Sequence, residues 1–312
     1  MKLLFEKLSD FPVSFFSVVM GLAGYALAVE KIEQTTGYSL YGWIISLFAL
    51  TVFSVLSILY AAKWYRFPNL VRDEFDDPVR LHFFPTFSIG LLLLSIAFLD
   101  ISPDTATVLW TIGTLLHLIL SFVIVSIWIR HDKFHPDHLN PSWFIPIVGN
   151  LIVPIAGMRI LPGSYLWFFF SIGIIFWIML LALFLDRAIF HKTLSARLIP
   201  TFFIIIAPPA VGAISYILMA GDVNEFAYIL YFFALFLALL FLANFPMFTK
   251  IRFSLSWWAF SFPICALSIA SSVIFTITGE DYLRSLSLVI FAILTIVIVT
   301  LLIRTTRRIL QD

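Results

Sequence analysis

Few residues in this chain are placed to do covalent chemistry, and most of the candidates are histidines. The stretch "RHDKFHPDH" holds His131, His135 and His138, but no cysteine or carboxylate in it fixes a known metal site. His117 stands alone in an apolar segment, where a hydrogen-bonded core histidine is expected rather than a proton relay. Cys265 is the single cysteine, so no disulfide can form within the chain. We therefore expect no metal site and no cofactor.

Motifs of common enzymes are also missing from the sequence. It contains no phosphate-binding glycine loop, no nucleophile elbow and no paired carboxylates within an apolar segment. An enzyme is therefore not expected. The polar residues that remain inside apolar segments are small and uncharged, and such residues either let helices pack closely or line a path for a solute.

The composition is that of an integral membrane protein. Of the 312 residues, 62% are hydrophobic and 12% are charged, whereas soluble domains are about half apolar and about a quarter charged. The formal net charge of +1 gives no indication of nucleic-acid binding.

Apolar segments long enough to cross a bilayer follow one another along the whole chain, and no charged residue lies within them. A lipid-exposed backbone with this pattern must be helical. The sequence therefore predicts one all-α transmembrane domain over residues 1–312 with ten spans. They cover about 12–29, 41–62, 81–99, 105–129, 141–158, 163–185, 198–220, 226–248, 253–277 and 285–303.

The basic residues predict the orientation. Sixteen of the 19 lysines and arginines fall on the side of the two termini, and Lys31, Arg159 and Arg284 fall on the other. Because cytoplasmic loops are enriched in Lys and Arg, we expect a multi-pass protein of the cell (inner) membrane with both termini in the cytoplasm. The stretch "VRDEFDDPVR" mixes both signs and is expected to be a solvated cytoplasmic loop.

Prolines separate two classes of span. Pro85, Pro146, Pro208 and Pro263 lie in the third, fifth, seventh and ninth spans, and the one proline of the even spans is Pro246, near the end of the eighth. A proline removes one backbone hydrogen bond, which is tolerated in a membrane where the break is buried or faces water. The pattern predicts five helical hairpins around a central pore, with the proline-kinked odd helices inside. The first span lacks an internal proline and has Gly21 and Gly24 instead.

The inner helices carry residues that could face such a pore. Helix packing would explain part of them, and the rest could line a watery path. Without rings of carboxylates, helix N-termini would favour anions weakly. The candidates for the pore lining are Ser17, Ser88, Asn150, Ser215 and Ser261.

Four stretches carry a resemblance to a known family. "DDPVRLHFFP", "NPSWFIPIVGN", "IIIAPPAVGAISYI" and "SWWAFSFP" fall at the starts or centres of the four proline-containing spans. Through these four stretches, the chain resembles the bacterial tellurite-resistance protein TehA, the fungal malate permeases and the slow-type anion channels of plant guard cells. The resemblance implies five hairpins around a pore, a homotrimer with one pore per subunit, and a phenylalanine that plugs the pore, which matches Phe262.

The resulting functional hypothesis is a gated anion channel that passes small anions such as chloride and nitrate and is occluded by Phe262. The alternative is a secondary transporter of a dicarboxylate such as malate, or of tellurite; a membrane scaffold without transport is a third class. Proton-coupled carriers usually have carboxylates within the membrane, and the spans here have none, which favours the channel.

Overall fold

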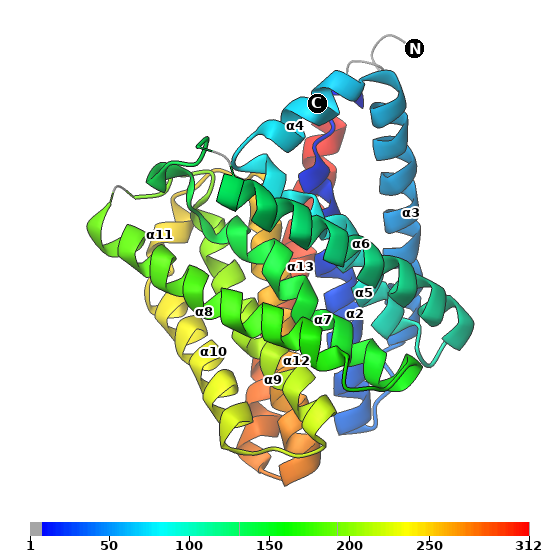
Figure 1. Ribbon diagram of the computed structural model, residues 1–312. Helices are drawn as coiled ribbons and strands as arrows, with labels where there is room; N and C mark the ends of the chain where they lie inside the picture. Colours follow the sequence, from blue (N-terminus) through cyan, green and yellow to red (C-terminus); the bar gives the residue numbers. More distant parts are fainter. Residues whose placement is uncertain (1–7, 131, 192, 312) are drawn as a thin grey trace.

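The computed structural model describes residues 8–130, 132–191 and 193–311 (Figure 1). In these residues it has ten helical segments long and apolar enough to cross a membrane, which confirms the predicted number of spans and the all-α fold. His131, one of the three histidines considered for a metal, lies outside the described residues.

Each odd-numbered span consists of a short 3-10 segment followed by an α-helix. The five pairs are η1 (Val13–Phe15) with α2 (Phe16–Thr36), η2 (Arg80–Phe83) with α5 (Pro85–Ala97), η4 (Pro141–Phe144) with α7 (Ile145–Ile160), η5 (Ile199–Ile206) with α9 (Ala207–Ala220), and η6 (Leu255–Phe260) with α12 (Ser261–Thr278).

The even-numbered spans are uninterrupted α-helices. They are α3 (Gly42–Arg66), α6 (Pro103–Arg130), α8 (Leu166–Phe190), α10 (Glu225–Ala243) and α13 (Asp281–Gln311). Three short helices lie between spans: α4 (Pro68–Asp76), η3 (Pro136–His138) and α11 (Pro246–Thr249).

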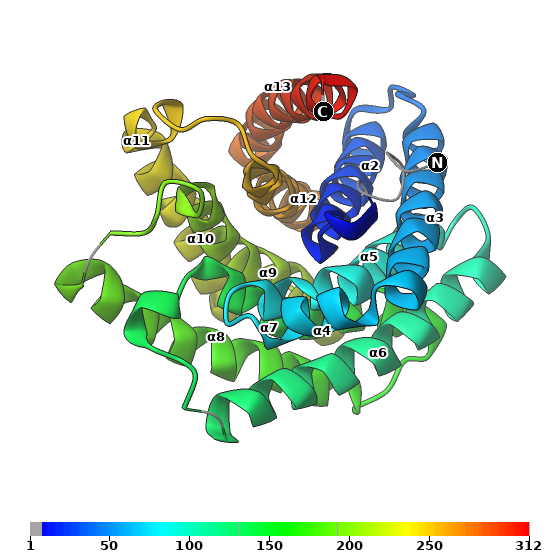
Figure 2. The same ribbon diagram turned by 90° about the horizontal axis from the view of Figure 1, so that it is seen from above.

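The five odd spans form a closed ring. Helix α2 packs against α5, α5 against α7, α7 against α9, α9 against α12, and α12 returns to α2 (Figure 2). Each ring helix also packs against the span that follows it in the chain. The share of buried residues is 67 to 78% in the odd spans and 22 to 39% in the even spans. The odd spans are therefore the inner layer, and the even spans present their apolar faces to lipid.

The prolines differ from the expected mid-helix kinks. Pro85 is the first residue of α5, Pro146 the second of α7, Pro208 the second of α9 and Pro263 the third of α12. A proline in the first helical turn has no amide hydrogen to leave unpaired, and the residues before it cannot bond to it and adopt tighter 3-10 turns. Each inner span is therefore interrupted at a change from 3-10 to α geometry. Among the described helices, Pro154 of α7 is the proline inside an α-helix.

The first inner span has the same 3-10 and α segments but, as predicted from the sequence, no proline where its α-helix begins. Its proline, Pro12, directly precedes η1 instead. Gly21 and Gly24 have another use, which is contact with α12. A Cβ atom on Gly21 would lie 2.4 Å from the Ser261 hydroxyl, and one on Gly24 would lie 3.2 Å from the Cys265 side chain. The two glycines let α2 approach α12 closely enough to close the ring.

Candidate functional site

Two cavities lie inside the ring of inner spans. The first, of about 570 Å³, is at the end where the inner spans begin, and we call it the inner cavity. All five spans contribute to its wall, through residues that include Ser17, Thr86, Val148, Ala207 and Pro263. The second, of about 190 Å³, lies toward the other ends of the same helices, and we call it the outer cavity. Its wall again has residues from all five, including Gly24, Leu93, Ile152, Val211 and Ala266.

Phe262 is the one described residue that lines both cavities. It is the second residue of α12, directly before Pro263, and its side chain is 6% exposed. A Cβ atom on Gly24 would come within 3.3 Å of its ring, so the ring lies against the part of α2 that has no side chain. The phenylalanine therefore lies where the two cavities meet.

Of the five residues predicted to line the pore, one lines a cavity and four are buried elsewhere. Ser17 is on the wall of the inner cavity, and its hydroxyl donates to the carbonyl of Ser14 at 2.6 Å. The other four, Ser88, Asn150, Ser215 and Ser261, are fully buried and are not among the residues that line either cavity. The Ser261 hydroxyl, for example, donates to the carbonyl of Trp258 at 2.6 Å. The structure thus buries these four side chains away from both cavities.

A buried polar network around His117 includes two of those side chains. The His117 Nε2 atom lies 3.1 Å from the carbonyl oxygen of Pro146, and its Nδ1 atom lies 2.9 Å from the Ser88 hydroxyl. Because a carbonyl can only accept, Nε2 carries the proton and Nδ1 accepts. The Asn150 amide donates to the same carbonyl at 3.0 Å. His117 is therefore a bonded core histidine that joins α5, α6 and α7, and Gly149 leaves room for its ring.

The histidines of the "RHDKFHPDH" stretch that the structure describes stabilise a turn. The backbone N–H of His135 donates to the Nδ1 atom of His138 at 3.2 Å, around the short helix η3. Among the described residues, no three histidine, cysteine, aspartate or glutamate side chains form a group that could hold a metal ion.

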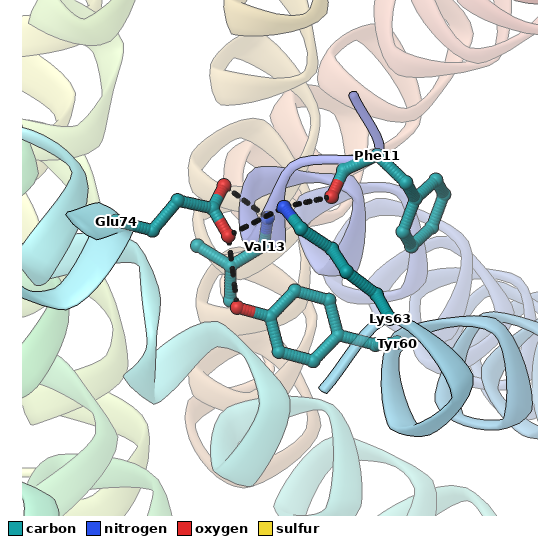
Figure 3. Close-up of polar contacts among 5 residues, drawn as sticks. All are labelled: Phe11, Val13, Tyr60, Lys63 and Glu74. Atoms are coloured by element: carbon teal, nitrogen blue, oxygen red, sulfur yellow. Dashed lines mark hydrogen bonds and ion pairs between the residues drawn. The ribbon is translucent and has the colours of Figure 1, made fainter. Parts of the chain in front are cut away.

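A buried ion pair lies on the wall of the inner cavity (Figure 3). The Lys63 Nζ atom is 3.0 Å from Glu74 Oε2, and the two side chains are 3% and 4% exposed. The Tyr60 hydroxyl donates to the same carboxylate oxygen at 3.0 Å. Lys63 also donates to the carbonyl of Phe11 at 2.8 Å, and the other oxygen of Glu74 accepts from the backbone N–H of Val13 at 3.2 Å. The pair thus holds the start of the first inner span.

Sequence reasoning missed this cluster. The stretch "VRDEFDDPVR" was expected to be a solvated loop, but the structure forms α4 there and buries Glu74 and Val71 on one face. The signal was the proline at the start of α4 followed by Val71 and Phe75, two apolar residues four positions apart, which is typical of one face of an amphipathic helix.

The rim of the outer cavity also carries charge. Lys31 and Glu30 of α2, Asp100 after α5 and Arg159 of α7 line it. The Arg159 Nη2 atom donates to Asp100 Oδ1 at 2.7 Å, and this hydrogen bond lowers the pKa of the Asp100 carboxyl from its ordinary value. The predicted spans ended before these residues. In the structure α2 and α7 extend beyond the predicted ends and include Glu30, Lys31 and Arg159, and Asp100 follows α5.

Comparison with known proteins supplies the family. Residues 10–306 match the SLAC1 family, which is described as a voltage-dependent anion channel. The chain is 28% identical over 305 residues to the S-type anion channel SLAH3 of Arabidopsis thaliana, which covers 95% of this chain and 48% of that protein.

For two prokaryotic relatives, the alignment covers similar shares of this chain and of the relative. An uncharacterized transporter of Methanocaldococcus jannaschii is 26% identical over 301 residues, which is 88% of this chain and 87% of the relative. The tellurite resistance protein TehA homolog of Haemophilus influenzae is 27% identical over 261 residues, which is 82% of this chain and 79% of the relative. The family match extends from before the first inner span to the last outer helix, so the chain belongs to the SLAC1 family of anion channels and transporters.

Proposed function

We propose that this protein is a gated anion channel in which Phe262 closes a path through the ring of inner helices. The observation that carries the proposal is that Phe262 lines both the inner and the outer cavity. A phenylalanine ring in a narrow passage excludes water, and an ion does not pass a dry constriction. Movement of one side chain would join the two cavities into a continuous path.

The inner helices support a preference for anions. The helices α5, α7, α9 and α12 begin at the inner cavity, to which residues of their first turns contribute. Helix N-termini carry partial positive charge. Small anions such as chloride and nitrate would be stabilised weakly by these dipoles. The names of the relatives, an S-type anion channel and a tellurite resistance protein homolog, agree with an anionic substrate.

Reconstitution tests the function. We expect purified protein in a planar bilayer with a chloride gradient to pass a current that reverses near the chloride equilibrium potential, small in the wild type and larger when the gate is removed. A saturable, proton-coupled uptake of malate or tellurite without such a current would instead make the protein a secondary transporter. The absence of both would contradict the proposal.

We also propose the orientation that the basic residues predict, with both termini in the cytoplasm and the inner cavity open to it. A reporter fused after Gly279, which follows α12, should lie outside the cell, and a reporter fused at the C-terminus should lie in the cytoplasm. Activity of either fusion on the opposite side would overturn the orientation. The homotrimer implied by the family resemblance stays a prediction.

A further inference from the structure

Most of the basic residues on the proposed outer face line the outer cavity. That face has three basic residues, Lys31, Arg159 and Arg284. Two of them, Lys31 and Arg159, line the outer cavity. Arg284 is not among the residues that line it, and its guanidinium lies over the ring of Phe275 at 5.9 Å. An anion that reaches Phe262 from outside therefore passes between two cations that come from different inner helices.

The partners of these two cations differ in charge. The Lys31 Nζ atom donates to the Gln34 amide oxygen at 2.9 Å, so this hydrogen bond brings no negative charge. Arg159 donates to the Asp100 carboxylate at 2.7 Å, and the two side chains are 57% and 72% exposed. An ion pair as exposed as this contributes little to stability. The carboxylate of Asp100 is therefore a weakly held anion at the mouth of the path.

The remaining acidic side chains near the mouth have partners on the other side of α2. Glu30 also lines the cavity, and its carboxylate accepts from the Ser46 hydroxyl of α3 at 3.0 Å. Glu33 accepts from the backbone N–H of Gly42 at 3.2 Å, at the start of α3. Both carboxylates thus have hydrogen-bond partners on α3, whereas Asp100 has its partner, Arg159, on the rim of the outer cavity.

We propose that Lys31 and Arg159 form a binding site for small anions at the outer end of the path, and that the Asp100 carboxylate occupies this site until a permeating anion displaces it. The inference rests on the proposed channel function and adds a recognition step to it. Opposite charges at a cavity mouth raise the local concentration of an ion within about 8 Å at physiological ionic strength. Asp100 would lower this effect by neutralising Arg159, so its removal should strengthen anion capture.

The test compares four single substitutions in a Phe262→Ala background, in which the path is open. With low external chloride, Asp100→Asn should raise the current carried by chloride entering from outside by about two- to fourfold, and Lys31→Gln and Arg159→Gln should lower it by about the same factor. Arg284→Gln is the matched control and should leave the current unchanged. The differences should shrink when an impermeant salt raises the ionic strength.

The possible results separate the site from the channel. If Asp100→Asn and Arg159→Gln lower the current equally, the ion pair is only structural and the site is overturned, while the channel stands. If the background variant passes no anion current, the channel proposal fails. The site is then judged from bromide-soaked crystals of the Asp100→Asn protein, where an anomalous peak between Lys31 and Arg159 supports it and no peak there overturns it.

Discussion

Replacing Phe262 by alanine is expected to convert a nearly silent protein into an open anion pore. The side chain lies where the inner and outer cavities meet, and its ring is 3.3 Å from the position that a Cβ atom added to Gly24 would take. Removing the ring leaves a space that water can fill. Because stripping water from an ion costs many kcal/mol, wetting of this passage decides whether an anion crosses. The preference for anions should persist, since it comes from helix N-termini and not from the ring.

Phe260→Ala is the matched control, because it makes the same change two positions earlier. The Phe260 ring lies 4.5 Å from the ring of Phe203 and 5.6 Å from that of Phe248, and it is not among the residues that line the two cavities. Its loss should cost stability, about 3 kcal/mol, without opening a path. Chloride and nitrate currents normalised to surface protein measure both variants. A silent Phe262→Ala, or a conducting Phe260→Ala, would show that the gate is elsewhere.

The second large effect concerns Glu74. Replacement by alanine removes the counter-charge of Lys63, which is 3% exposed and also donates to the backbone carbonyl of Phe11. Breaking a buried ion pair from one side typically costs about 3 to 5 kcal/mol, because the remaining charge is left desolvated. Glu74 also accepts from Tyr60 and from the backbone of Val13. We therefore expect Glu74→Ala to lower the free energy of unfolding strongly.

Two further variants separate charge from packing in this cluster. Asp73→Ala removes a carboxylate from the neighbouring, exposed position and should change stability by less than about 0.5 kcal/mol. The double variant Lys63→Met, Glu74→Leu removes both charges and should recover most of the loss. Unfolding in detergent, followed by the fluorescence of the tryptophans, measures all three. Equal losses in Glu74→Ala and the double variant would mean that the contacts with Tyr60 and Val13 matter more than the charge.

The sequence was sufficient for the architecture because membrane helices obey local rules. Apolar length defines the spans, and prolines within the apolar segments, such as Pro85, Pro146 and Pro263, indicated the inner ones, where the backbone is covered by other helices. The first span remains an exception, because Pro12 lies before its 3-10 segment and not at the start of its α-helix.

The sites were harder to predict because they depend on which way a side chain points. Ser88 and Asn150 have the residue types of a pore lining, but they make hydrogen bonds to side chains of α6, Ser88 to His117 and Asn150 to Ser121. Helical periodicity shows which residues share one face of a helix, but it does not show whether that face packs against another helix or lines a cavity. Glu74 is a stronger case, because its contact with Val13 joins residues 61 positions apart, and no local pattern reports such a contact. Phe262 was found through the motif around it and not through its register.

The closed ring of inner helices has a consequence for how the protein is made. The contact that completes it joins α2, in the first described span, to α12, in the ninth, which is synthesised much later. Until α12 is inserted, the side of α2 that carries Gly21 and Gly24 has no helix against it, and any solute path through the bundle stays open sideways to lipid. We therefore expect an incomplete chain to have no enclosed path for ions. Such a path forms late in synthesis, when α12 packs against α2.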